Sequence, residues 1–378
     1  ETLCKCESKC DKDTEKWKSS IQQCIPDPPQ MTEVEVYEIE IQATGADEAE
    51  ERAAEVIAAF KLSKVGFIKD ELDNTITWNK IVLKLTPGLY VFTDDMADGK
   101  SWVIDDNDRQ IDLMGGPDVH FTRKEGSATP FGFLKSSGTI ININGIKFTN
   151  WGGDNFNQRG VVIFNLGSIM TVENSVFSNN SSIGDLMDND YTGAGGAIAN
   201  QHELIVRYSG FYNNTVISAG PDGCGGAIWS ETGYALIENS VFAYNEVIGM
   251  ASFDGTNRTN GSAVCLSRNT GAIYLNYVTA AFNRASGPKS DEVPDGIPLS
   301  GGAFSSLPGD QSYMDDNFSD MLAGRVGNFY ITNSVGWKNH GGTFDLTNGL
   351  INFKSEGNNI IDDASGEIYL NQTGDVNG

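Results

Sequence analysis

Short stretches in which apolar and polar residues alternate dominate the chain after residue 80. Alternation with a period of two predicts β-strands that bury one face, and the Gly, Pro, Asn and Asp residues between the stretches predict tight turns. Strands are therefore expected near residues 81–85, 89–92, 102–104, 111–113 and 140–143.

The second half of the chain repeats a two-part pattern. Gly-Gly-Ala-Ile at 195–198 recurs at 225–228, and related segments begin at Gly160, Gly261, Gly301 and Gly341. An apolar element ending in Asn follows each copy. The pairs 160/180, 195/214, 225/245, 261/283 and 341/359 are 20, 19, 20, 22 and 18 residues apart, and a polar insertion lengthens 301/339 to 38. A near-constant core with variable excursions predicts stacked coils. The fold class expected is all-β, a right-handed parallel β-helix.

The asparagine that closes each copy is expected to stack at one corner of the coils. Asn tolerates left-handed backbone angles, and its amide can bond to the amide in the next coil. Phe177, Phe211 and Phe242 precede three of these residues and are expected to form a column inside. The predicted ladder contains Asn180, Asn214, Asn245, Asn283, Asn339 and Asn359.

Three regions are expected along the chain. Residues 1–31 form a Cys-rich head that ends in prolines, and residues 32–77 form a small α/β N-terminal cap on a β-helix of residues 78–378. In the cap, the pattern at 34–41 predicts an edge strand with a bulge, because the alternation slips once in phase. An amphipathic helix follows, with an apolar face of Ala49, Ala53, Val56, Ile57 and Phe60.

The cysteines and glycosylation signals indicate a secretory route. An even number of Cys, four of them crowded at the front, fits disulfides, while a zinc site in the head is the competing interpretation. Asn180 cannot both stack in a buried corner and carry a glycan, so Asn179 and Asn213 are expected to face outward. Disulfides are predicted among Cys4, Cys6, Cys10, Cys24, Cys224 and Cys265. Glycans are predicted on Asn179, Asn213, Asn257, Asn260, Asn317 and Asn371.

Charge narrows the classes of partner. The chain carries 26 Lys and Arg against 51 Asp and Glu, a net charge of −25. Such a charge repels nucleic acids and anionic lipids. No stretch has the length of a membrane-spanning helix, so no transmembrane segment is expected. The cysteines and glycosylation signals predict an extracellular location.

Motifs for catalysis are scarce. His120, His202 and His340 have no metal-ligand spacing, and no nucleophile elbow or nucleotide loop occurs. Asp105, Asp106 and Asp108 fit three alternatives: a solvated turn, a calcium site or a catalytic carboxylate pair. No cofactor is required by the sequence, and calcium is the one ion that it suggests. The sequence favours a protein that is not an enzyme.

The Gly-Gly-Ala-Ile and Phe-x-x-Asn pairing, as at 195–198 with Phe211 to Asn214, resembles the repeats of chlamydial polymorphic outer-membrane proteins. The resemblance covers roughly residues 160–360. It implies a β-helical surface protein with adhesive or structural roles. Residues 81–150 also look like the opening coils of pectate-lyase-like enzymes, a likeness of scaffold that carries no function.

The excursions after the Asn corner are expected to emerge along one edge and to carry acidic residues and glycans. Such loops are either ordinary solvated loops or the interaction surface. The last strand has no visible cap, which predicts either a longer native chain or a partner, such as another copy, at that end. Together these features predict a structural or adhesive glycoprotein of a cell-surface filament, appendage or sheath. Its partners would be further copies, or cell-surface or extracellular-matrix proteins or glycans. A polysaccharide lyase or hydrolase is the alternative.

Overall fold

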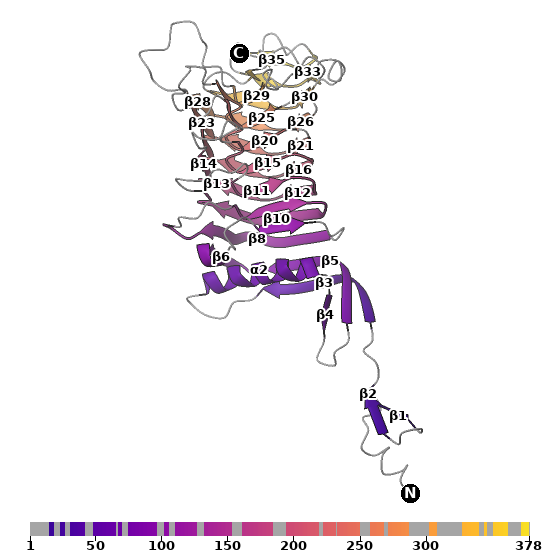
Figure 1. Ribbon diagram of the computed structural model, residues 1–378. Coiled ribbons are helices and arrows are strands. Elements are labelled where there is room, and N and C mark those ends of the chain that lie inside the picture. Colours follow the sequence, from indigo (N-terminus) through magenta and orange to yellow (C-terminus); the bar gives the residue numbers. More distant parts are fainter. Residues whose placement is uncertain are drawn as a thin grey trace, which may run out of the picture.

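Figure 1 shows the fold of the chain in a computed structural model. The structure describes residues 15–18, 23–26, 31–41, 48–65, 67–69, 75–96, 102–105, 110–126, 132–152, 161–183, 194–218, 222–231, 233–249, 258–267, 271–286, 302–307, 327–339, 344–345, 351–361 and 372–377.

The described chain is almost entirely β, and its strands stack in parallel, one coil on the next, as the sequence predicts. The longest sheet has two strands in most coils, separated by a bend. The strands before the bend are β3 (Met31–Ile41), β5 (Thr75–Leu85), β8 (Gln110–Arg123), β10 (Ile140–Thr149), β12 (Ile169–Glu173), β16 (Glu203–Arg207), β21 (Tyr234–Glu238), β26 (Ala272–Asn276), β30 (Gly327–Thr332) and β33 (Ile351–Ser355). Those after it are β6 (Gly88–Phe92), β13 (Val176–Ser178), β17 (Gly210–Tyr212), β22 (Val241–Ala243), β27 (Thr279–Ala281), β31 (Val335–Trp337), β34 (Ile360–Ile361) and β35 (Val376–Asn377). The long strands β8 and β10 continue through the bend.

Two further parallel sheets form the other sides of the coils. The second sheet contains β7 (Trp102–Asp105), β9 (Leu134–Ser137), β11 (Ile163–Asn165), β15 (Ile198–Asn200), β20 (Ile228–Ser230), β25 (Val264–Ser267), β29 (Phe304–Leu307) and β32 (Phe344–Asp345). The third contains β14 (Ser181–Ile183), β18 (Thr215–Ser218), β23 (Glu246–Gly249) and β28 (Arg284–Ser286). The small pairs β1 (Glu15–Lys18) with β2 (Gln23–Pro26) and β19 (Asp222–Cys224) with β24 (Arg258–Asn260) lie outside these sheets.

The Gly-Gly-Ala-Ile repeat and its relatives mark the starts of β11, β15, β20, β25, β29 and β32 in the second sheet. Its fourth residue forms one register column, Ile163, Ile198, Ile228, Val264, Phe304 and Phe344. The first glycine, Gly225 for example, has a φ of 71°. The second has no room for a side chain, because a Cβ on Gly226 would lie 2.2 Å from the carbonyl oxygen of Ser262 in the next coil. The pair thus combines a left-handed turn with close contact between coils.

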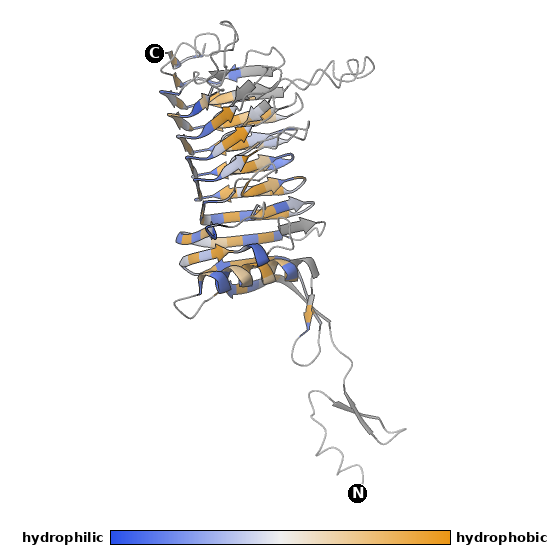
Figure 2. Ribbon diagram, turned by 60° about the vertical axis from the view of Figure 1, so that its left-hand side comes forward, coloured by the Kyte–Doolittle hydropathy of each residue, from blue (hydrophilic) through white to orange (hydrophobic). Residues whose placement is uncertain are grey.

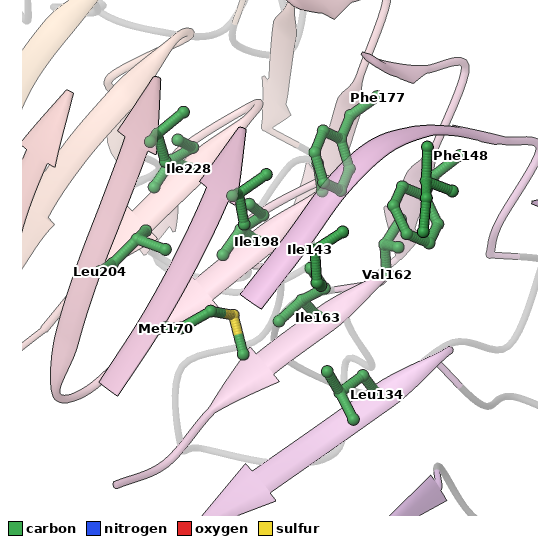
Figure 3. Packing of buried hydrophobic residues seen from close by; sticks show 14 of the residues in the cluster. Leu134, Ile143, Phe148, Val162, Ile163, Met170, Phe177, Ile198, Leu204 and Ile228 are labelled. Carbon is green, nitrogen blue, oxygen red and sulfur yellow. The ribbon is translucent and has the colours of Figure 1, made fainter. Parts of the chain in front are cut away.

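Apolar side chains of all these strands meet inside the coils. Figure 2 shows hydrophobic and hydrophilic residues alternating along the long strands of the first coils. In Figure 3, Leu134 and Ile163 of the second sheet point toward Ile143 and Met170 of the first. Phe148, Phe177, Phe211 and Phe242 stack on successive coils, with ring centroids 4.9, 5.0 and 4.7 Å apart. The predicted phenylalanine column is therefore present and extends one coil further back.

Helix α2 (Ala49–Val65) lies across the N-terminal coils (Figure 1). Its residues Ala53, Val56, Ile57 and Phe60 are buried in the main core, and Phe60 packs 5.8 Å from Phe133 between ring centroids. The helix thus covers apolar side chains of the first coils. The short elements β4 (Phe67–Lys69), antiparallel to β5, and η1 (Asp94–Met96) complete this end.

The expected bulge at 34–41 is absent. Strand β3 pairs with β5 in parallel with one constant offset, from Met31 opposite Thr75 to Ile41 opposite Leu85. The slip in alternation is absorbed by Val36, which stays 41% exposed on the outer face. An edge strand accommodates an exposed valine more readily than it loses a ladder of backbone hydrogen bonds. Strand β5 also runs across the domain boundary expected at 77/78.

Candidate interaction surface

An asparagine ladder runs through the corner between the first and third sheets. The Nδ2 of Asn180 donates to the Oδ1 of Asn214 at 2.8 Å, and the same bond links Asn214 to Asn245, Asn245 to Asn283 and Asn283 to Asn339 at 2.9, 2.9 and 3.0 Å. Four of these side chains are fully buried, and Asn339 is 9% exposed. Each amide satisfies backbone groups as well, so the ladder holds the coils in register.

The structure corrects the expected place of Asn359. Its Oδ1 accepts from the backbone N–H of Ser334 at 2.9 Å, and Ile360 pairs with Val335. Asn359 therefore aligns with Ser334 at the bend of the first sheet, directly before β34. Ser334 lies five residues before the ladder residue Asn339. The spacing of 18 residues from Gly341 resembled the other copies, but the strand pairing assigns it to another column.

The left-handed backbone angle also lies one residue before each ladder asparagine. Asn179, Asn213, Tyr244, Phe282 and Lys338 have φ values of 56, 52, 58, 57 and 48°. The ladder residues themselves are absent from the positive-φ positions of the described chain. A left-handed residue turns the chain so that the next side chain points inward.

A second polar column, which the sequence reasoning missed, lies at the bend of the first sheet. The backbone N–H of Ser175 donates to the Oγ of Ser209 at 3.2 Å, and that of Ser209 donates to the Oγ of Ser240 at 3.2 Å. Asn359 and then Asp375 continue this column. Burial raises the pKa of Asp375, but hydrogen bonds from Ser355, Asn359 and Gln372 outweigh it and hold the pKa below its ordinary value. The sequence does contain a signal for this column, because a Ser lies five residues before four of the ladder asparagines.

The outer surface of the first sheet exposes a cluster of tyrosines. Tyr234, Tyr274 and Tyr330 stack across adjacent coils, with ring centroids 5.3 and 4.4 Å apart. Tyr208 and Tyr277 occupy the left-handed position at the bend, with φ of 50 and 54°, and are 60 and 57% exposed. We call these five residues the tyrosine face.

Two tyrosines of the tyrosine face, Tyr234 and Tyr274, have raised pKa values. Burial raises the pKa of Tyr234, and the carboxylates of Glu203 and Glu238 raise it further. Burial also raises the pKa of Tyr274, and its contact with Tyr330 adds to the effect. The phenols of Tyr234 and Tyr274 therefore stay neutral well above pH 7 and can donate hydrogen bonds.

Acidic side chains border the tyrosine face and share one arginine. The Nε of Arg207 lies 2.9 Å from the Oε2 of Glu238, and its Nη1 lies 3.4 Å from the Oε1 of Glu173. The three residues come from successive coils, β12, β16 and β21. Such partly exposed pairs contribute little to stability, so the row chiefly fixes side-chain positions beside Tyr208.

The predicted glycan acceptors that the structure describes are placed differently from one another. Asn179 and Asn213 are exposed, whereas Asn180, which also starts an acceptor sequence, is buried. The backbone of Asn260 lies in β24. Asn257, Asn317 and Asn371 lie outside the described residues.

Cys224 and Cys265 form a disulfide, which settles one pairing that the sequence left open. The bond lies in a second apolar cluster with Ala194, Ala199 and Trp229, on the outer side of the second sheet. Parts of the excursions therefore fold back over that sheet and are clamped there. Cys4, Cys6 and Cys10 lie outside the described residues, and of Cys24 only the backbone, in β2, is described.

Replacing both Cys224 and Cys265 with serine is expected to lower the free energy of unfolding by about 3 kcal/mol, because the bond closes a loop of roughly forty residues. The change should appear as a lower urea midpoint and as faster amide exchange in β19 and β20. Glu238→Gln, a change on the partly exposed outer surface, is a control that should leave both nearly unaltered. An unaltered midpoint in the serine variant would show that the excursion is held by packing alone.

The described residues assemble no metal centre: within them, no group of three or more His, Cys, Asp or Glu is placed to hold an ion. Of the suggested calcium ligands, Asp106 and Asp108 lie outside the described residues and only the backbone of Asp105 is described, in β7. The Nε2 of His120 lies 2.5 Å from the Oγ1 of Thr149, and burial lowers the pKa of His120. His202 is exposed, and His340 is not described.

None of the described helices is long and apolar enough to cross a membrane. Comparison of the chain with protein-family models, with curated proteins and with solved structures gives no match.

Proposed function

We propose that the coils close into a right-handed parallel β-helix that serves as a non-catalytic structural or adhesive rod outside the cell, a subunit of a cell-surface filament, appendage or sheath. The resemblance of its repeats to those of chlamydial surface proteins supports this role. So does the fact that successive coils are joined by buried ladders, which make a rigid scaffold.

The observation that carries the proposal is the tyrosine face. Three of its tyrosines stack over adjacent coils and two more are largely exposed on the same sheet, and surfaces with several exposed large side chains mark interaction sites. Tyr208 and Tyr277 also hold left-handed backbone angles that aromatic residues seldom adopt, whereas Asn174, Asn239 and Asn333 occupy the same column. Strain of this kind is retained where the side chain has a use. Tyrosine suits an interface because it offers apolar area and a hydroxyl group together.

The partner best supported is a second copy of the chain. Tyr234, Tyr274 and Tyr330 stack over three adjacent coils, and Glu173, Arg207 and Glu238 form a row over three, so two rods can pair along several coils. The Arg207 guanidinium beside two carboxylates gives a surface with both signs of charge, which suits pairing of identical faces.

Sedimentation velocity and negative-stain electron microscopy of the glycoprotein test the proposal. Wild-type protein is expected to form filaments or lateral arrays as its concentration rises. The variant Tyr208→Asn/Tyr277→Asn should assemble only at a protein concentration at least about tenfold higher, a loss of roughly 1.4 kcal/mol, because it lacks two exposed tyrosine side chains. It should still fold, because Asn already occupies other positions of the same column. Asn174→Gly in the same column is the matched control.

Dispersed rods at every concentration, unaltered by the tyrosine changes, would overturn the self-assembly proposal. If the same preparation cleaved acidic polysaccharides in the presence of calcium, the lyase or hydrolase alternative would replace it.

A further inference from the structure

One column of residues lies directly before the ladder asparagines, and its residue types change along the rod from asparagine to aromatic. It contains Asn150, then the glycan acceptors Asn179 and Asn213, and then Tyr244, Phe282 and Lys338, all with left-handed backbone angles. That conformation is ordinary for Asn and costly for an aromatic residue. A tyrosine and a phenylalanine on successive coils therefore indicate that their side chains gain contacts that offset the backbone strain.

Part of that gain is stacking between the two rings. The ring centroids of Tyr244 and Phe282 lie 5.1 Å apart and their planes differ by 6°. Because the rings are parallel and one coil apart, Phe282 covers one face of Tyr244. The opposite face points back toward the preceding coil. Tyr244 remains 56% exposed.

Asn213 occupies the same column in that preceding coil. Its backbone N–H donates to the carbonyl of Ala243 at 3.2 Å, and Tyr212 pairs with Ala243, so Asn213 is fixed one step from Tyr244. Asn213-Asn214-Thr215 is an acceptor sequence for N-glycosylation. Asn214 is buried in the ladder and Asn213 is exposed, so the acceptor amide lies outside the coil.

We propose that the first N-acetylglucosamine of a glycan on Asn213 packs against the free face of Tyr244, which makes this corner a built-in sugar-binding site. A pyranose presents C–H groups on one face, and the negative face of an aromatic ring attracts them. The sugar would extend the Tyr244 and Phe282 stack by one coil. The inference rests on the secretory route in the proposed function, not on the tyrosine face.

Asn179 supplies an internal control. It is exposed, left-handed and an acceptor like Asn213, but the next residue in its column is Asn213 rather than an aromatic ring. A sugar on Asn179 therefore has the same linkage and the same corner without the ring contact.

Mass spectrometry of the protein from its native source should first find Asn213 occupied. For protein made in a secretory host with labelled sugars and trimmed to one N-acetylglucosamine per site, we expect the NMR signals of the Asn213 sugar ring to lie upfield of those of the Asn179 sugar. The upfield shift should be lost in Tyr244→Asn and kept in Tyr208→Asn, which removes a left-handed tyrosine from the other corner.

A thermal cycle gives a second readout. Asn213→Gln should lower the unfolding midpoint by about 2 °C more in the wild-type background than in the Tyr244→Asn background, because the strain of Gln at a φ of 52° is common to both. An unoccupied Asn213, or identical signals for the two sugars, would overturn the inference while leaving rod association, read by sedimentation, untouched. Absence of glycans from every acceptor in the native protein would overturn the extracellular assignment as well.

Discussion

Replacing Asn245 with alanine is expected to lower the free energy of unfolding by about 4 kcal/mol. The Asn245 side chain is fully buried and makes four hydrogen bonds. Its Nδ2 donates to Asn283 and to the carbonyl of Phe211, and its Oδ1 accepts from the side chain and the backbone of Asn214. Alanine leaves these partners buried and without a bond, and such groups cost about 1–3 kcal/mol each, less than additively.

Urea unfolding and amide exchange measure the loss. Amide exchange should accelerate most in β18, β23 and β28, because each of these strands begins directly after a ladder asparagine. Asn239→Gly is the matched control, because Asn239 lies on the same coil, is exposed and has a φ of 48° that glycine adopts freely. Equal effects of the two changes would mean that the ladder contributes no more than any corner asparagine.

Truncating Phe211 to alanine is expected to lower the free energy of unfolding by roughly 3–4 kcal/mol, through lost burial and the cavity that remains. Phe211 is fully buried between Phe177 and Phe242, which stack on it at 5.0 and 4.7 Å with nearly parallel planes. The coils cannot collapse into the cavity, because the asparagine ladder and the second polar column fix the spacing between coils on both sides of Phe211.

Phe211→Leu separates volume from stacking in this column. It keeps most of the buried apolar area and removes the ring contacts, so it should cost less than half as much as alanine. Both variants can be followed by urea midpoint, and xenon or benzene binding would detect the cavity in Phe211→Ala. A midpoint for Phe211→Ala within error of the wild type would show that the coils do collapse.

Much of the fold was predictable because a stacked coil repeats its own constraints in the sequence. A glycine recurs at the left-handed turn of the copies, and in four of the six copies a second glycine follows it, as at Gly225 and Gly226 where the coils are in close contact. A buried asparagine must recur where two backbone groups need the same partner. Helix α2 was predictable from local periodicity, because its buried face is written at helical spacing in a single segment.

The interaction surface was much less predictable. The tyrosine face joins residues such as Tyr234 and Tyr274 that lie 40 positions apart in the sequence. No fixed interval separates its members, because the excursions between them vary in length. The left-handed position of Tyr244 follows from the turn into the ladder, and the sequence pattern placed that angle one residue too late.

Which residues face inward in each coil is encoded locally, since period-two alternation and the glycine and asparagine repeats specify the strands and corners. Which coil each residue stacks on emerges only when the chain folds. Folding placed Asn359 in the second polar column, paired Cys224 with Cys265, and brought Tyr244 next to Asn213. The physical reason is that the spacing within a coil is written along the chain, whereas contacts between coils depend on the register of the backbone hydrogen bonds between them.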